Sequence, residues 1–137
     1  MIVFLSIHPQ HAEAILNRRK RYEFRRVSPR EVTKLILYAT SPVQRIVGHA
    51  DVAAVLSGSP EAIWKRCQNG AEISYDYFKA YFADRDQAFA MEVKRAVRLR
   101  HPVEVGTLGE FTVPQSYRYL DAAGFGRVLA RGNRSAA

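Results

Sequence analysis

Runs of apolar residues that end at turn signals predict a sheet in the first half of the chain. Residues 1–7, MIVFLSI, and residues 34–40, KLILYAT, are rich in β-branched and other apolar side chains. Each run ends just before an X-Pro pair, which is typical of buried strands. Residues 45–58, RIVGHADVAAVLSG, predict one long strand or a pair of strands. Gly48 inside this segment indicates a bulge or a close approach of another backbone.

Residues 21–26, RYEFRR, alternate in a way that predicts a further short strand. Tyr22 and Phe24 fall on one face of such a strand, and Glu23 and Arg25 fall on the other. We expect the two aromatic side chains to lie in the core. The two charged side chains are then expected to face outward, where they can pair.

Three segments have the spacing and end signals of short helices. Residues 9–19, PQHAEAILNRR, begin with a proline and carry apolar residues at helical spacing. Residues 60–69 follow Ser59 and stop at Gly70. Residues 75–82, YDYFKAYF, follow a serine that can cap a helix.

Residues 87–100, QAFAMEVKRAVRLR, predict another strand. Its odd positions are largely apolar: Phe89, Met91, Val93, Val97 and Leu99. Its even positions include three cations: Lys94, Arg98 and Arg100. We expect residues 101–111 to form a loop and residues 113–121, VPQSYRYLD, to begin a short terminal helix.

This order of elements predicts an α+β fold with a mixed or mostly antiparallel sheet, because strands and helices do not alternate regularly. The length of 137 residues suits one domain. We expect the domain to span residues 1–125. Residues 126–137 are expected to form a short, basic C-terminal tail that is frayed at its end.

Charge and cysteine content narrow the class of protein. The formal net charge is +8 and the pI is about 10.0, which favours a negatively charged partner such as nucleic acid or an anionic surface. The single cysteine, Cys67, excludes an internal disulfide and suits a reducing compartment. The apolar start is too short for a signal sequence, and no segment is long enough to span a membrane. We therefore expect a soluble, cytoplasmic protein with no membrane partner.

The sequence lacks the strong motifs of phosphate-binding loops and nucleophile elbows. His8 and His11 are three residues apart, but no cysteine or carboxylate set completes a metal site around them. We therefore expect no metal and no cofactor. The even-face cations Lys94, Arg98 and Arg100 either contact phosphates peripherally or form an ordinary solvated strand face. The aromatic residues of segment 75–82 can stack on bases, although core packing explains them better.

The stretch KRYEFRR carries more information than the other basic segments. Lys20, Glu23 and Arg25 can converge in one cleft, where they would perturb one another's pKa values as groups in functional sites do. The alternative is a surface ion pair worth less than about 1 kcal/mol. Residue spacing alone does not decide between a site and a surface pair.

Several segments together resemble the ASCH (activating signal cointegrator homology) domain in its short stand-alone prokaryotic form. They are LSIHPQHAEAILNRRKRYEFRR, LILYATSPVQRIVG, AFAMEV and VPQSYRYL. The family has a Gly-x-Lys-x-x-Glu-x-Arg stretch, which Lys20, Glu23 and Arg25 match. Arg18 stands where the family usually has glycine, a residue that tolerates positive φ far better than arginine does.

The resemblance implies a PUA-like small β-barrel of five or six strands with peripheral helices. It also implies a cleft beside the first helix, lined by the Lys20–Arg26 stretch and by the loop at Ser41. Segment 115–118 is expected to close the cleft from the other side. The residues expected to bind nucleic acid in this cleft are Lys20, Glu23, Arg25, Arg26, Ser41, Gln115, Ser116, Tyr117 and Arg118.

Three functional hypotheses follow from the resemblance. The first is a module that binds RNA, single-stranded nucleic acid or a nucleotide-like ligand, with a regulatory role in translation, RNA processing or transcription. The second is a hydrolase that acts on RNA or a modified nucleoside, for which Lys20 and Glu23 are the candidate catalytic residues and His8 an alternative base. The third is a transcriptional coregulator that binds protein or DNA. The oligomeric state is left open.

One branch of the family deacetylates N4-acetylcytidine with a lysine, a threonine three residues later and a distant glutamate. Lys20 matches that lysine, but Glu23 stands at the threonine position. A carboxylate is a poor substitute for a hydroxyl nucleophile in amide hydrolysis. We therefore expect that this mechanism does not apply to the chain.

Overall fold

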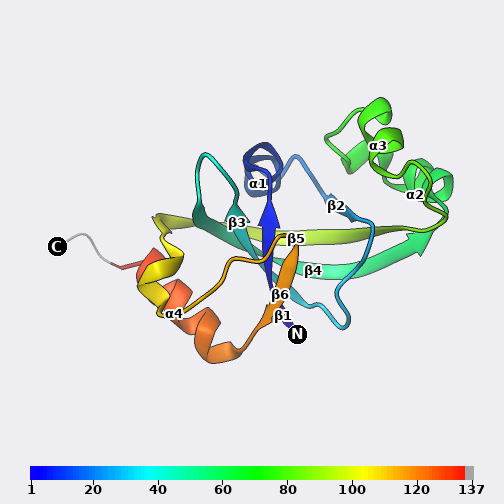
Figure 1. Cartoon of the computed structure of the whole chain (residues 1–137). Helices are drawn as coiled ribbons and strands as arrows, with labels where there is room; N and C mark the ends of the chain where they lie inside the picture. Colours follow the sequence, from blue (N-terminus) through cyan, green and yellow to red (C-terminus); the bar gives the residue numbers. More distant parts are fainter. Residues whose placement is uncertain (135–137) are drawn as a thin grey trace.

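The computed structural model describes residues 1–134 and contains one six-stranded sheet. The strands are arranged in the order β2-β5-β4-β3-β1-β6. Their bounds are β1 (Ile2–Ile7), β2 (Tyr22–Arg25), β3 (Lys34–Ala39), β4 (Arg45–Gly58), β5 (Ala88–Val103) and β6 (Tyr117–Leu120). β1 and β3 pair in parallel, whereas the other neighbouring strands pair antiparallel. The sheet is therefore mixed, and it curls into a half-barrel (Figure 1).

Helices cover the sheet at three places. The described residues form α1 (Pro9–Leu16), α2 (Pro60–Cys67), α3 (Tyr75–Tyr81) and α4 (Ala122–Gly132), together with the short 3-10 helices η1 (Gln68–Gly70) and η2 (Val105–Leu108). α1 crosses the middle of the sheet, α2 and α3 lie together at one end, and α4 lies at the other end (Figure 1). The predicted α+β fold with peripheral helices is confirmed. None of the helices in residues 1–134 has the length and apolar character needed to cross a bilayer.

Three groups of buried apolar residues hold these layers together. The first lies inside the curl of the sheet, where Ile15 and Leu16 of α1 pack against strands β1 and β3. The second lies under α2 and α3, which contact Tyr22 and Phe24 of β2. The third joins α4 to the opposite side of the sheet. β2 is buried on both faces, because Glu23 on one face is as inaccessible as Tyr22 and Phe24 on the other.

β5 departs from the regular alternation that its sequence predicts. Between the pairs His49↔Val97 and Asp51↔Lys94, β5 has one residue more than β4, and Arg95 in this bulge adopts φ 51°. A bulge changes which side of the sheet the following residues face. Val97, which the alternation placed in the core, is 42% exposed, and Ala96 is buried instead. The assignment of Val97 to the apolar face was therefore wrong.

The C-terminal region is also more ordered than the sequence indicated. Residues 117–120, expected to begin a helix, form strand β6, which pairs with β1. Helix α4 follows, capped by the Asp121 side chain, and its Val128 is buried in the third group of apolar residues. The part of the predicted tail up to Gly132 is therefore helical and packed. β5 extends to Val103 into the predicted loop, and residues 135–137 lie outside the described part of the chain.

Candidate functional site

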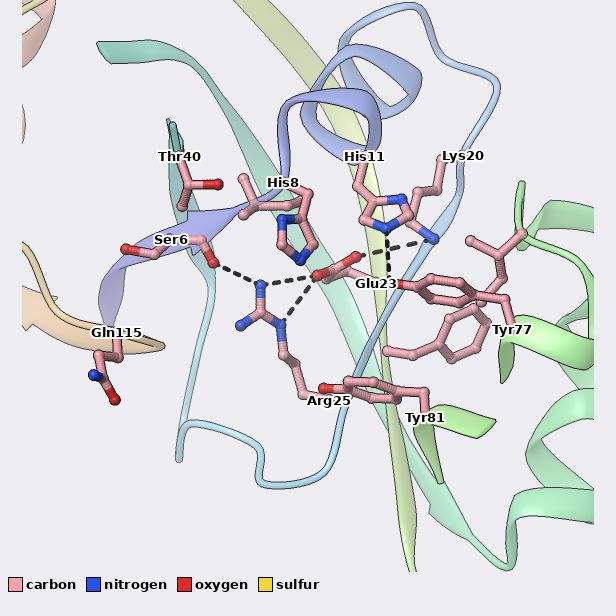
Figure 2. Close-up of a pocket in the computed structure, with 13 residues that line it drawn as sticks. Ser6, His8, His11, Lys20, Glu23, Arg25, Thr40, Tyr77, Tyr81 and Gln115 are labelled. Carbon is pink, nitrogen blue, oxygen red and sulfur yellow. Dashed lines mark hydrogen bonds and ion pairs between the residues drawn. The ribbon is translucent and has the colours of Figure 1, made fainter. Parts of the chain in front are cut away.

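A pocket of about 170 Å³ opens between α1, α3 and the end of β1, with β2 as its floor. Figure 2 shows that the side chains of Lys20, Glu23 and Arg25 meet in this pocket and that His11 of α1 points toward Tyr77 of α3. The lining residues are Ser6, Ile7, His8, His11, Lys20, Glu23, Phe24, Arg25, Thr40, Ile73, Tyr77, Tyr81 and Gln115. The pocket thus contains the Lys20, Glu23 and Arg25 set that the sequence singled out.

The end of α1 positions Lys20. The Arg18 amide donates to the Ile15 carbonyl, and the Arg19 amide donates to the Ala14 carbonyl. These two bonds form a Schellman motif, in which the residue after the helix cap takes a left-handed conformation and is usually glycine. Arg18 occupies that position with φ 62°. The turn is therefore retained although arginine replaces the glycine of the family pattern.

Lys20 is almost completely buried, with an exposed fraction of 2%. Its Nζ donates to the Ala71 carbonyl at 2.7 Å and lies 3.9 Å from Oε1 of Glu23. It also lies 5.0 Å from the centre of the Phe24 ring. An ammonium has three N–H donors, and within residues 1–134 only one of them is in a hydrogen bond. Donors of Lys20 are therefore available to a ligand in the pocket.

Glu23 is buried between two cations. Its Oε2 accepts from Nε of Arg25 at 3.0 Å and lies 2.9 Å from Nη2 of Arg25, while its Oε1 is the atom nearest to Lys20. The expectation that Glu23 faces outward was wrong, because the curled sheet encloses this face as well as the face of Tyr22 and Phe24. The alternative of a surface ion pair is excluded by the burial of Glu23.

Arg25 connects the edge strand β2 to the opposite edge of the sheet, which is formed by β1 and β6. Its Nη2 donates to the carbonyl of Ser6 at 2.9 Å (Figure 2), and its Nη1 donates to Oγ of Ser116 at 3.4 Å. Ser6 in turn donates its hydroxyl to the Pro114 carbonyl at 2.7 Å. The gap between the β2 edge and the β1–β6 edge is therefore bridged by a guanidinium. Its position places one positive charge at the base of the pocket.

Burial and neighbouring charges shift two pKa values in the pocket. Burial lowers the pKa of Lys20, and the nearby Glu23 carboxylate partly opposes this shift. Burial likewise lowers the pKa of His11, again opposed by Glu23. His11 is thus favoured as a neutral imidazole, with its Nε2 3.4 Å from the Tyr77 hydroxyl.

The sequence treated four pocket residues as minor candidates or as core. His8 and His11 share one side of the start of α1 and both line the pocket. Tyr77 and Tyr81 are four residues apart on α3, so they share a helix face, and that face borders the pocket. The signal was the i, i+3 spacing of the histidines and the i, i+4 spacing of the tyrosines. Core packing, the preferred explanation for the aromatic residues of this segment, is correct for Phe78 and Phe82, which are buried, and in part for Tyr81, which packs against the same apolar group.

Other residues predicted for the cleft lie at its edge or away from it. Ser41 is exposed, and its neighbour Thr40 lines the pocket. Gln115 also lines the pocket, whereas Tyr117 packs partly against the interior apolar group. Arg118 faces the other side of β6, where its guanidinium lies 4.4 Å from the Phe111 ring.

The three even-position cations of β5 do not form one uniform row. Both guanidinium Nη atoms of Arg98 donate to the carboxylate of Glu13, at 2.9 and 2.8 Å. Lys94 and Arg100 are exposed. Lys94 precedes the bulge, and Arg100 follows it and lies near the end of α4, where its amide donates to Asn133. None of the three lines the pocket. Within the described residues, no group of three or more histidine, cysteine, aspartate or glutamate side chains is arranged to hold a metal ion.

Comparison with known proteins places the chain in a family. The model described as "ASCH domain" matches residues 5–97, more than half of the chain. The chain belongs to the ASCH domain family. This confirms the resemblance found in the sequence.

Two relatives and one solved structure are similar to this ASCH domain. A Zymomonas mobilis protein named "ASCH domain-containing ribonuclease" is 30% identical over 122 residues, which cover 85% of this chain and 82% of that protein. The large ribosomal subunit protein uL22 of Ureaplasma parvum is 27% identical over 120 residues, or 86% of this chain. This ASCH domain spans only 39% of that relative's length. The crystal structure of ASCH from Zymomonas mobilis has a TM-score of 0.87 at 26% identity, covering 94% of each chain.

Proposed function

We propose that this ASCH domain binds single-stranded RNA and holds one nucleotide in the pocket beside α1. The observation that carries the proposal is the buried ammonium of Lys20. It lines the pocket, and within residues 1–134 it donates one of its three N–H groups, to the Ala71 carbonyl. Glu23 balances the charge of Lys20 from 3.9 Å, but within residues 1–134 the other N–H donors of Lys20 have no hydrogen-bond partner, and a buried donor without an acceptor is costly. A base edge or a phosphate oxygen is an acceptor of the required kind.

The remaining walls of the pocket suit the parts of an unpaired nucleotide. Tyr77, which contacts His11, supplies an aromatic wall, and Arg25 adds a second cation on the other side of Glu23 from Lys20. Single-stranded RNA is recognised by stacking of splayed bases and by hydrogen bonds to their edges. The cavity is smaller than the roughly 300–1,000 Å³ of pockets for drug-sized ligands. It therefore suits one nucleotide unit of a longer strand.

A charge-matched pair of variants tests this proposal. Binding of a fluorescein-labelled, unstructured RNA octamer is measured by anisotropy at several salt concentrations. Lys20→Met is expected to weaken binding at least about tenfold, because a hydrogen bond from a charged donor is worth about 1.5–3 kcal/mol. Arg127→Gln on α4 removes the same charge away from the pocket and should change affinity much less.

Two results would refute the binding proposal. One is the absence of binding by the wild-type protein at low salt, and the other is equal weakening by Lys20→Met and Arg127→Gln. Circular dichroism melting curves of both variants establish that they are folded. Tighter binding to double-stranded DNA than to the RNA octamer would instead support the coregulator hypothesis.

RNA cleavage in the same pocket is the second candidate function. It is favoured by the two histidines on the pocket wall and by the name of the 30% identical relative, "ASCH domain-containing ribonuclease". In metal-free cleavage, a base removes the 2′-hydroxyl proton, the 2′-oxygen attacks phosphorus, and the 5′-oxygen leaves with a proton from an acid. Neutral His11 suits the base better than Glu23, whose oxygens are already paired with cations.

Labelled RNA and the same RNA with 2′-O-methyl groups distinguish cleavage from binding alone. If this mechanism operates, the unmodified strand is cut and the methylated strand is not. His11→Gln should then slow cleavage by the 10²- to 10⁴-fold that general acid–base groups typically contribute. Cutting of the methylated strand, or an unchanged rate for His11→Gln, would exclude the mechanism.

A further inference from the structure

Phenylalanines and tyrosines in and next to α3 have different environments: the phenylalanines are in the core, and two of the tyrosines line the pocket. Phe78 and Phe82 are buried in the apolar group under α2 and α3. Tyr81, at the end of the helix, is only partly buried and lines the pocket. Its ring packs edge-on against Phe82, with centroids 4.8 Å apart and an interplanar angle of 81°. One edge of the Tyr81 ring is therefore held by the core.

Arg26 holds the same ring from one face. Its guanidinium carbon lies 4.3 Å from the centre of the Tyr81 ring. Its Nε donates to the backbone carbonyl of Tyr81 at 2.8 Å. A contact with the ring and a contact with the backbone together restrict both side chains. Tyr81 is thus a pre-ordered aromatic surface next to the pocket.

Both side chains keep unused hydrogen-bonding groups. Arg26 is exposed, makes no ion pair within residues 1–134, and uses one of the five donors of a guanidinium. The Tyr81 hydroxyl makes no hydrogen bond to the described residues, in contrast to the Tyr77 hydroxyl, which contacts His11. An ordered aromatic ring beside an unpaired guanidinium matches the two parts of a nucleotide, its base and its phosphate.

We propose that Arg26 and Tyr81 form a second nucleotide subsite at the mouth of the pocket. The base of the neighbouring nucleotide stacks on Tyr81, and its phosphate binds the Arg26 guanidinium. This inference rests on the proposed binding of RNA in the pocket. It makes a dinucleotide the smallest ligand that uses the whole site.

A fluorescent base and a single nucleotide separate the two subsites. In an RNA octamer that carries 2-aminopurine, stacking of this fluorescent base on Tyr81 quenches its fluorescence. Adenosine 5′-monophosphate, titrated by NMR, is a single nucleotide and fills only the pocket that contains Lys20. Tyr81→Leu is expected to weaken octamer binding by between about 5-fold and 150-fold, the range for one base–aromatic stack. It should also abolish the quenching, and it should weaken binding of the mononucleotide by a much smaller factor than binding of the octamer. Tyr81→Phe should retain the quenching.

The phosphate contact has its own measurement. Arg26→Gln should reduce the slope of log K against log salt by about 0.7, the value for one phosphate contact on single-stranded nucleic acid. Arg127→Gln on α4 is the matched control and should leave the slope unchanged. Equal slopes for wild type and Arg26→Gln would overturn the assignment of the phosphate to Arg26.

Other outcomes distinguish failure of the subsite from failure of the pocket. The subsite is overturned if Tyr81→Leu behaves like Tyr75→Leu, a change of an exposed tyrosine on the same helix that does not line the pocket. It is also overturned if Tyr81→Leu weakens the mononucleotide and the octamer by the same factor, since Tyr81 would then belong to the first subsite. Octamer binding that depends on Lys20 but not on Tyr81 overturns the subsite and retains the proposed function. Wild-type protein that binds neither probe overturns both.

Discussion

Glu23→Gln tests the role of the buried charges in the fold most directly. The substitution preserves the shape of the side chain and removes the negative charge between Lys20 and Arg25. The side chains of Lys20, Glu23 and Arg25 are 2%, 7% and 13% exposed, so water screens these charges poorly. The variant leaves two buried cations without their counter-charge.

The geometry sets the size of the expected effect. At 3.9 Å, the separation of Lys20 Nζ and Glu23 Oε1, two unit charges attract by about 4 kcal/mol at an effective dielectric constant of roughly 20. Removing one partner of a buried ion pair typically destabilises a protein by about 3–5 kcal/mol. We expect Glu23→Gln to lower the free energy of unfolding by that amount at pH 7.

The effect should depend on pH with a definite sign. Burial already lowers the pKa of Lys20 from its ordinary value of 10.5, and loss of the Glu23 carboxylate removes the main charge that raises it. Between the folded-state pKa and 10.5, the unfolded chain binds more protons, so stability rises with pH across that window. The destabilisation by Glu23→Gln should therefore be smaller at pH 10 than at pH 7.

Urea unfolding at the two pH values, in a double-mutant cycle with Lys20→Met, measures both quantities. The double variant should be destabilised by less than the sum of the two single variants, since neither charge is then left alone. Glu13→Gln is the matched control, because Glu13 pairs with Arg98 at the surface and should contribute no more than about 1 kcal/mol. A loss below 1 kcal/mol for Glu23→Gln, or additive effects in the cycle, would refute the reasoning.

Three further predictions concern the residues around the pocket. Gly48→Ala should destabilise the fold by about 1–3 kcal/mol in urea unfolding, because the new Cβ would lie 2.5 Å from Leu16 and 2.6 Å from the Val97 carbonyl; a change below 0.5 kcal/mol would contradict this. The His11 imidazole should titrate with a midpoint below 6.5 in proton NMR, since burial lowers its pKa. The stability that neutral His11 contributes to the fold is then complete above pH 6.5 and is lost as pH falls through the folded-state pKa. A midpoint at or above 6.5 would contradict this prediction. Arg18→Gly should raise the free energy of unfolding by up to about 1 kcal/mol, because glycine adopts the left-handed turn at φ 62° without strain; a loss of stability would show that the Arg18 side chain matters more than its backbone.

The local pattern of apolar and polar residues was sufficient to predict elements whose burial is evident from a few consecutive residues. The apolar runs of β1 and β3 and the helical spacing of α1 identify these elements because burial on both faces, or on one helical stripe, selects apolar residues directly. The family motif also placed Lys20, Glu23 and Arg25 together, as the structure does. Local pattern was insufficient for β6, where Tyr117–Leu120 alternate weakly and form a strand by pairing with β1.

The sequence by itself determined that the chain has an α+β fold, a basic charge and one polar stretch of unusual composition. Only the tertiary structure decided that Glu23 is buried, because this depends on the curl that brings β2 opposite β1 and β6 and lets Arg25 reach Ser6 and Ser116. The same curl brings α1 and α3, far apart in the sequence, to adjoining walls of one pocket, where His11 contacts Tyr77. Periodicity records which face of an element is apolar. It does not record which distant element covers that face, and the pocket exists only because of how these distant elements pack.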